Sequence, residues 1–394
     1  MRRRLRRPMM LRDMRHRLVT ASMAAGLSVL AVSPARGQAA SDPATRLAAQ
    51  AEAARAANRP DQATALYRQA LQARPRWAEG WFHLGTLLYD GDAHAEAAAA
   101  LRTATALDPS VGTAWVMLGL CEYRLGAFAD ALEHVQKGRR LGVSADPQFR
   151  LVMRYHEGLL LVHAAEFERA QEVLDELGAE GVDTADLDVA QGLAALRMRP
   201  GELPPGGLAA GDSPLRTLVI AAGRAEGLFA RHQLADAQRA FEALAADHPA
   251  TRNVHYALGR FFVRAEQPAP AVAAFEREIA LSPDHVPARL GIAAIVMQDD
   301  PSRALRLVDE AIARNPHVPL AHYLRGRLLL DRGDAAGAVP ALETAERSVK
   351  DDPGVYYALS RAYAQLGRTA EADRARATFT RLNEARQAAA RRTP

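Results

Sequence analysis

Residues 78–109 read AEGWFHLGTLLYDGDAHAEAAAALRTATALDP, and this stretch decides the fold. It is rich in Ala and Leu, which favour helices, and it lacks the period-two alternation of strands. The proline that closes this stretch recurs in two groups along the chain. Pro75 and Pro109 are 34 residues apart, and Pro249, Pro283 and Pro316 follow one another at separations of 34 and 33 residues. A fixed period near 34 indicates a helix-turn-helix unit copied many times, because each copy needs a neighbour to bury its apolar face.

The unit resembles a tetratricopeptide repeat, which has an aromatic residue at place four, Leu-Gly at seven and eight, Ala at twenty, a large residue at twenty-four, Ala at twenty-seven and Pro at thirty-two. The matching residues in this unit are Trp81, Leu84, Gly85, Ala97, Leu101, Ala104 and Pro109. Partial copies read Trp115, Leu118, Gly119 and Ala131; Gly158 and Ala170; Ala237, Phe241 and Pro249; Leu258, Gly259, Ala271, Phe275 and Pro283; Ala304, Ala311 and Pro316; Gly326, Ala338, Leu342 and Ala345; Leu359, Tyr363 and Ala372. The resemblance covers roughly residues 44–387 and implies an all-α, right-handed solenoid of about nine repeats.

The matched positions have physical roles. Gly or Ala on the first helix lets the second helix approach closely, where a longer side chain would overpack. Aromatic side chains fill the wedge between successive helix pairs. Proline closes the second helix because it lacks an N–H group and clashes with the preceding turn.

The basic charge of the chain is concentrated at its start. The formal net charge is +4, yet the first 39 residues hold nine arginines against the single Asp13, a balance of +8 that leaves −4 for the rest. The mature chain is therefore not a nucleic-acid binder by composition. An Arg-rich start, an apolar run from Leu18 to Val32 and small residues up to Ala39 predict a signal peptide over residues 1–39.

This leader predicts a periplasmic or secreted protein of bacterial type. The alternative is an uncleaved signal that anchors the chain in the inner membrane, but about 15 apolar residues are fewer than the roughly 20 that span a bilayer. We therefore expect no stable membrane span after cleavage.

The sequence lacks the motifs of the common enzyme and cofactor sites. His156-Glu157 begins a zinc-protease pattern, but the second ligand position holds Leu160. Lys137 and Lys350 lack the residues that surround the lysine of a phosphate-binding loop. Cys121 is the only cysteine, so no internal disulfide can form. We expect no enzyme, no cofactor and no metal site.

The repeat pattern breaks once. The run 186–198 contains a first-helix-like Gly192, but the sequence RPGELPPGG at 199–207 cannot form the expected second helix. This predicts an N-terminal array over 44–183, a degenerate repeat with a Pro/Gly-rich loop over 184–214, whose helix lacks a partner, and a C-terminal array over 214–387. The loop is either a hinge or contact surface, or the remnant of a decayed repeat.

Tyrosines and arginines recur at the first-helix places that, by the resemblance, face a concave groove. These candidate partner-binding residues are Phe82, Tyr89, Tyr123, Arg124, Tyr155, Tyr256, Arg260, Arg264, Tyr323, Arg327, Tyr357 and Arg361. Tyrosine offers a large face with a polar tip, and arginine offers five donors for carboxylates or carbonyls. The alternative is that the tyrosines pack against neighbouring helices and the arginines are ordinary solvated charges.

The resemblance, taken together with the leader, implies a non-enzymatic scaffold of the cell envelope that captures a protein or peptide in this groove. The family's carboxylate clamp, Lys at place five and Asn at place nine, is absent, because those places hold Phe82 with Thr86 and Tyr256 with Arg260. An acidic chaperone tail is therefore not the expected ligand. Two other functions stay open: a carbohydrate-binding or envelope-polysaccharide protein, and a structural spacer or homo-oligomer. The sequence does not set the oligomeric state.

Overall fold

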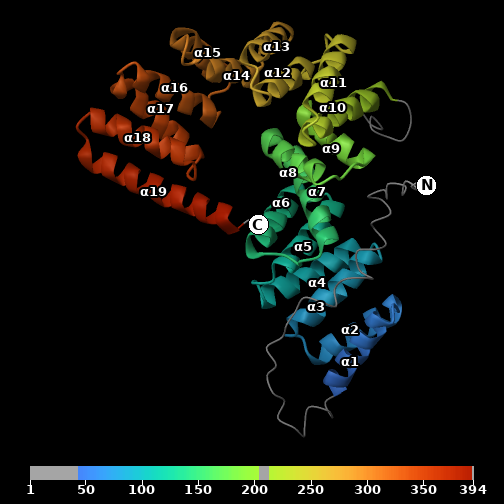
Figure 1. The fold of residues 1–394 in the computed structure, drawn as a ribbon. Helices are drawn as coiled ribbons and strands as arrows, with labels where there is room; N and C mark the ends of the chain where they lie inside the picture. The colour runs from blue at the N-terminus through green and yellow to red at the C-terminus, as the bar shows by residue number, and fades with distance from the viewer. Residues whose placement is uncertain (1–42, 204–212, 393–394) are drawn as a thin grey trace. The chain divides into compact units, whose positions relative to one another are not determined.

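The computed structural model describes residues 43–203 and 213–392. Over these ranges the chain forms nineteen α-helices and no strand, which confirms the all-α prediction (Figure 1). The helices are α1 Pro43–Ala56, α2 Pro60–Ala73, α3 Ala78–Asp90, α4 His94–Leu107, α5 Gly112–Arg124, α6 Phe128–Leu141, α7 Pro147–His163, α8 Phe167–Ala179, α9 Ala185–Ala195, α10 Pro214–Ala230, α11 Leu234–Asp247, α12 Val254–Arg264, α13 Pro268–Leu281, α14 Val286–Val296, α15 Pro301–Arg314, α16 Pro319–Asp331, α17 Ala335–Ser348, α18 Pro353–Gln365 and α19 Thr369–Arg392; a short 3₁₀ turn spans Pro200–Glu202.

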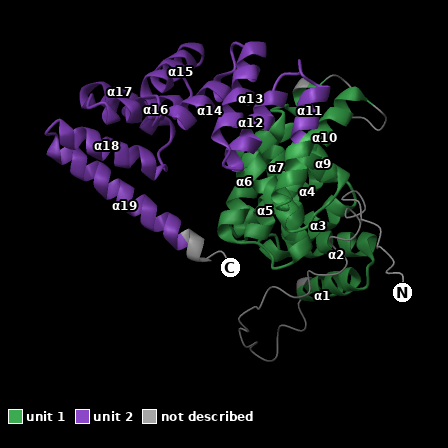
Figure 2. Cartoon of the chain, turned by 45° about the horizontal axis from the view of Figure 1, so that its top comes forward, with its two compact units in different colours: residues 1–240 green, residues 241–394 purple. Residues whose placement is uncertain are grey.

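The described chain divides into two compact units, residues 1–240 and 241–394, with the division inside α11 (Figure 2). We call them unit 1 and unit 2. Within each unit the helices pack as consecutive pairs, and the pairs contact their neighbours along the chain. The pairs of unit 1 include α3 with α4, α5 with α6 and α7 with α8, and those of unit 2 include α12 with α13, α14 with α15, α16 with α17 and α18 with α19.

The small residues of the repeat are buried where the two helices of a pair meet. The alanines at place twenty are at most 2% exposed: Ala97, Ala131, Ala170, Ala237, Ala271, Ala304, Ala338 and Ala372. A Cβ added to Gly85 on α3 would lie 2.6 Å from Cγ of Leu101 on α4. The close approach of the paired helices therefore depends on the residues that the repeat pattern keeps small.

Place four of the first helix caps the preceding repeat. Trp81 Nε1–H donates to the carbonyl oxygen of Pro75 at 2.9 Å, and Trp115 Nε1–H donates to that of Pro109 at the same distance. Each pair of residues is six positions apart. The proline that ends one repeat and the aromatic residue that opens the next are thus joined by a hydrogen bond as well as by packing.

The helix before the Pro/Gly-rich loop has a packing partner. α9 packs extensively against α10, which follows the loop. A Cβ added to Gly223 on α10 would lie 1.7 Å from the carbonyl oxygen of Asp188 on α9. The prediction that this helix lacks a partner is therefore wrong. Its partner is α10, which follows the Pro/Gly-rich loop in the sequence and meets α9 through a glycine contact.

The predicted signal peptide and part of the predicted Pro/Gly-rich loop fall on residues that the structure does not describe. The signal peptide over 1–39 lies outside the described residues, and residues 204–212 of the loop do so as well. Among the helices that are described, none combines the length and apolar character needed to cross a membrane.

Candidate functional site

Four of the candidate residues come together on the first helices of unit 1: Tyr89 of α3, Tyr123 and Arg124 of α5, and Tyr155 of α7. We call them the Arg124 group. The Arg124 side chain interacts electrostatically with Tyr89, Tyr123 and Tyr155. All four side chains are half-buried. Partial burial raises the pKa of each tyrosine, so the phenols remain neutral donors at physiological pH.

Aromatic and imidazole rings extend the Arg124 group. The Tyr123 ring lies edge-on to His156 at 5.1 Å and to Phe128 at 5.6 Å, and Phe128 stacks on His163 at 3.8 Å. Burial lowers the pKa of His163, which favours the neutral ring. Phe128 and His163 were not among the predicted residues, because they stand at the start of α6 and the end of α7, outside the repeat places expected to face a groove.

An acidic residue lies at the edge of the Arg124 group. Asp90 ends α3 directly after Tyr89, and burial raises its pKa to about 7. Its charge acts on the Tyr89 phenol. The guanidinium and three phenols of the Arg124 group therefore have beside them a carboxyl that holds its proton more tightly than an ordinary aspartate does.

Phe82 and Tyr256 are buried. Phe82 is 8% exposed, and its ring lies 5.4 Å from that of His83. Tyr256 is 5% exposed and packs on His285 at 4.8 Å and on Phe275 at 5.6 Å. At these two positions the geometry matches the packing alternative.

The other candidates of unit 2 are spread over α12, α16 and α18. Arg260 and Arg264 on α12 are half-buried. The Arg327 guanidinium lies 5.8 Å from the ring centre of Tyr323 on α16. Tyr357 on α18 is 52% exposed, and its ring lies 5.5 Å from that of Phe379. The Arg361 side chain pairs with Asp331 at 3.6 Å.

Reactive groups do not converge in the described part of the chain. No set of three or more His, Cys, Asp or Glu residues there could hold a metal ion. Cys121 is buried, and burial raises the pKa of its thiol to about 12. The Nδ1 atom of His156 is hydrogen-bonded to the carbonyl oxygen of Val152 at 2.8 Å.

Solved structures that are similar to this chain include MamA and Cut9–Hcn1. A crystal structure of MamA is 19% identical over 41% of this chain and 96% of its own, with a TM-score of 0.38. MamA from Desulfovibrio magneticus RS-1, residues 41 to the end, is 18% identical over 46% of this chain and 98% of its own, with a TM-score of 0.38. Cut9–Hcn1 of the APC/C is 14% identical over 86% of this chain and 87% of its own, also with a TM-score of 0.38.

The family comparison is more direct. None of the curated proteins compared with the chain matches it. A tetratricopeptide repeat model matches residues 48–110, 87–142, 223–286, 289–353 and 323–382, which together span more than half of the chain. These matches agree with the helix pairs, the buried small residues and the 34-residue period described above. The chain belongs to the tetratricopeptide repeat family.

Proposed function

We propose that this protein is an exported, non-enzymatic scaffold that captures a protein or peptide partner on the first helices of unit 1. The observation that carries the proposal is the Arg124 group, in which residues from three successive repeats combine one guanidinium with three partly accessible phenols. Family membership supports the choice of a protein partner, because tetratricopeptide folds are typically protein-interaction scaffolds.

The chemistry of the group suits an extended or helical peptide. Arg124 can donate to a carboxylate or to backbone carbonyls, and the tyrosine rings provide flat apolar area with polar tips. Phe128 and His163, stacked beside Tyr123, enlarge that area. A ligand that brings a carboxylate near Asp90 would meet a carboxyl that can itself be neutral, which reduces repulsion.

Export and an envelope role belong to the same proposal. They rest on the Arg-rich start, the apolar run and the small residues up to Ala39, together with the acidic balance of the remaining sequence.

Crosslinking in intact cells tests the proposal. A photoreactive residue replaces Tyr155, and the captured protein is identified after cell fractionation. We expect one dominant adduct, and we expect Arg124→Gln combined with Tyr123→Ala to reduce it at least tenfold while helicity is retained. Arg239→Gln, which removes an exposed cation of α11 that pairs with Asp236, is the matched control and should leave the adduct unchanged. An adduct of equal yield in the double variant would remove the Arg124 group as the capture surface.

One observation favours a second function. Burial of Phe82 and Tyr256 shows that two of the predicted contact residues serve packing, as expected for a spacer. A chain that yields no adduct from Tyr155 and none from a photoreactive residue at the exposed Tyr357 would fit the spacer function instead.

A further inference from the structure

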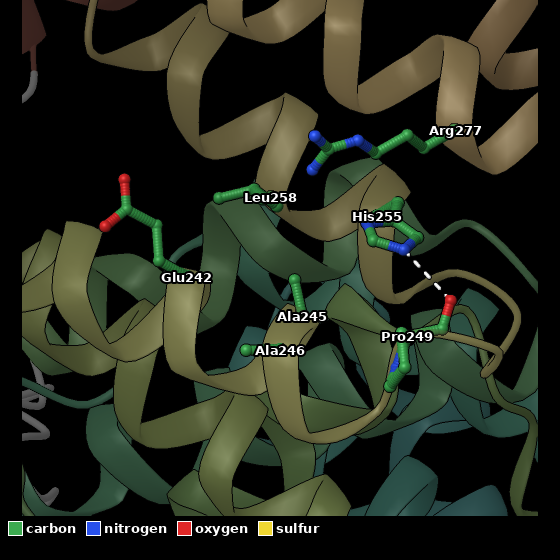
Figure 3. Close-up of a pocket in the computed structure, with 7 residues that line it drawn as sticks. All are labelled: Glu242, Ala245, Ala246, Pro249, His255, Leu258 and Arg277. Atoms are coloured by element: carbon green, nitrogen blue, oxygen red, sulfur yellow. Dashed lines mark hydrogen bonds between the residues drawn. The ribbon is translucent and has the colours of Figure 1, made fainter.

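A hollow of about 380 Å³ lies in unit 2 beside α11, α12 and α13, and the imidazole that lines it serves the fold (Figure 3). His255 Nε2–H donates to the Pro249 carbonyl oxygen at 3.0 Å, in the same way that Trp81 caps the preceding repeat through Pro75. The Nδ1 atom of His255 is enclosed by the protein. The charged surface of unit 2 lies elsewhere, on its first helices.

The first helices of unit 2 carry a large excess of positive charge. Helices α12, α14, α16 and α18 contain six arginines and a single carboxylate, Asp331. The arginines are Arg260, Arg264, Arg289, Arg325, Arg327 and Arg361. Helices α3, α5 and α7 of unit 1 contain three arginines and four carboxylates. Charge complementarity therefore favours an acidic partner for the first helices of unit 2.

Two of the six arginines are held by carboxylates of a second helix. The Arg289 side chain is 4% exposed and pairs with Glu310 of α15 at 3.0 Å. Arg325 pairs with Asp309 of the same helix at 2.8 Å. These two cations join the helices of neighbouring pairs, so the excess charge that faces a partner comes from the other arginines.

Arginine recurs at place nine of the first helix in unit 2. The arginines at this place are Arg260, Arg327 and Arg361. In unit 1 the same place holds Thr86, Leu120 and Leu159, which are at most 9% exposed. The Nη1 atom of Arg260 is buried. The place-nine cations that a ligand can reach best are therefore Arg327 and Arg361.

Arg327 and Arg361 each follow a tyrosine by four residues, Tyr323 on α16 and Tyr357 on α18. Residues four apart lie on the same face of a helix, so each tyrosine stands beside its arginine. The two helices are in contact, and a Cβ added to Gly354 at the start of α18 would lie 3.0 Å from the Tyr323 hydroxyl oxygen. The two tyrosine–arginine pairs thus lie side by side, and we call them the α16–α18 face.

The α16–α18 face is open to solvent at α18. Tyr357 is 52% exposed, and the Arg361 side chain is 44% exposed. Its ion pair with Asp331, at 3.6 Å, is exposed on both sides, because the Asp331 side chain is 41% exposed. Such a pair contributes little to stability, so a better-placed carboxylate can displace Asp331.

We propose that the α16–α18 face binds an acidic segment of a partner protein in the polyproline II conformation, with a carboxylate at every third residue. Packed helices have axes roughly 8–10 Å apart. Residues three apart in a polyproline II chain lie on one side of it at a spacing of about 9 Å, whereas same-side residues of a β-strand are roughly 7 Å apart. Successive carboxylates therefore meet Arg327 and Arg361, whose planar guanidinium groups can each bind a carboxylate through two hydrogen bonds.

Tyr357 contributes the apolar part of the α16–α18 face. Its exposed ring stands beside the two cations, and a proline between two acidic residues can pack on it, as prolines do in other aromatic-lined grooves. The whole face belongs to unit 2. Its test is therefore separate from that of the Arg124 group in unit 1.

Fluorescence anisotropy on the full chain tests this site with three rhodamine-labelled heptapeptides. The first is Glu-Pro-Pro-Glu-Pro-Pro-Glu, the second has glutamine in place of each glutamate, and the third has the same composition as the first with its three glutamates grouped at one end. We expect saturable binding of the first peptide, at least tenfold weaker binding of the second and at least threefold weaker binding of the third. Equal binding of the first and third peptides would mean that charge alone is recognised and would overturn the proposed spacing.

Variants assign the binding to the α16–α18 face. Arg327→Gln and Arg361→Gln should each weaken binding of the first peptide about threefold, and the double variant at least tenfold. Arg347→Gln, which removes an exposed cation from the second helix α17, is the matched control and should leave binding unchanged. Asp331→Asn should tighten binding about twofold, because it removes the carboxylate that competes for Arg361, and this gain keeps the test decisive if the double variant does not fold.

Three results would overturn the proposal. The first is that the native chain does not bind the first peptide. The second is that the double variant folds and binds it like the native chain, or, if the double variant does not fold, that Asp331→Asn does not tighten binding. The third is that polygalacturonate binds the native chain in a manner that Arg361→Gln weakens while the first peptide does not bind, which would assign the face to an acidic polysaccharide.

Discussion

Gly192 of α9 lies directly against the carbonyl group of Val219 on α10: a Cβ at this glycine would be 1.8 Å from that oxygen. Together with Gly223 against Asp188, this makes a two-way backbone contact between helices on either side of the Pro/Gly-rich loop. The contact joins the degenerate repeat to the helix that follows the loop, although the sequence between them breaks the repeat pattern.

Gly192→Ala should destabilise unit 1 by about 1–3 kcal/mol, because the backbone of α10 must move to admit the methyl group. The urea midpoint followed by far-UV circular dichroism measures the effect. Gly201→Ala is the control, since a Cβ there meets no atom within 4 Å. Equal midpoints for Gly192→Ala and the native chain would show that α9 and α10 can separate without cost.

Trp115 stabilises its repeat by two separable contributions, and two variants distinguish them. Trp115→Phe keeps a ring but leaves the Pro109 carbonyl without its donor, which should cost about 0.5–1 kcal/mol at this exposed site. Trp115→Ala also removes the surface beneath Lys137 and the contact with His134, and should cost about 2–3 kcal/mol. Urea denaturation followed by circular dichroism measures both; an identical loss in the two variants would show that the ring contributes nothing beyond the hydrogen bond.

Asp90 should make stability fall as the pH rises from about 4 to about 7. Its folded-state pKa of about 7 exceeds the ordinary value, so over this window the unfolded carboxyl loses its proton while the folded one retains it, and unfolding is favoured. The native chain should therefore lose roughly 1–3 kcal/mol across this window relative to Asp90→Asn.

Thermal unfolding of the native chain and of Asp90→Asn at a series of pH values measures the Asp90 contribution as the difference between their free energies of unfolding. Asp92→Asn is the matched control, because the Asp92 side chain is 90% exposed two residues away. Parallel pH profiles for the native chain and Asp90→Asn would contradict the prediction.

Glu157 is a charged residue at the place that Leu84, Leu118 and Leu258 occupy in other repeats. It is fully buried on α7, its two carboxylate oxygens accept no hydrogen bond from the described residues, and it pairs with Arg139 at 3.2 Å. Burial raises its pKa. Glu157→Leu, which copies Leu84 and Leu118, should stabilise the chain by about 1–4 kcal/mol because the desolvation cost of the carboxylate disappears.

A double-mutant cycle with Arg139 checks this explanation. Arg139→Ala alone should destabilise the chain by about 1–2 kcal/mol, since it leaves a buried carboxylate without its cation, whereas the same change in the Glu157→Leu background should have almost no effect. A destabilising Glu157→Leu would mean that the carboxylate serves the fold in a way the ion pair does not explain.

The sequence predicted the repeat because its signals are local. Trp81, Gly85, Ala97 and Pro109 each constrain one helix or one contact within a single unit, and those contacts are present. The candidate contact residues were harder to predict, because exposure depends on what the next repeat supplies. Tyr256 and Tyr357 share place five, yet Tyr256 is covered by His285 of the following repeat, whereas Tyr357 belongs to the last described pair, which no described repeat follows.

The pairing of α9 with α10 also could not be inferred from residue types. The contact depends on Gly192 and Gly223, which the loop separates along the chain, and nothing in the intervening residues indicates that they meet. The Arg124 group extends beyond its predicted members for a similar reason, since Phe128 and His163 enter it from the ends of two different helices.

The sequence by itself determined the helical repeat, its period and the small residues that let paired helices touch, because helix propensity and the termination of a helix by proline act within a single unit. Only the tertiary structure decided which tyrosines remain accessible, which helix covers the degenerate repeat and where a hollow opens beside His255. Those properties depend on how side chains from different repeats pack against one another, and the local sequence around each residue does not encode that packing.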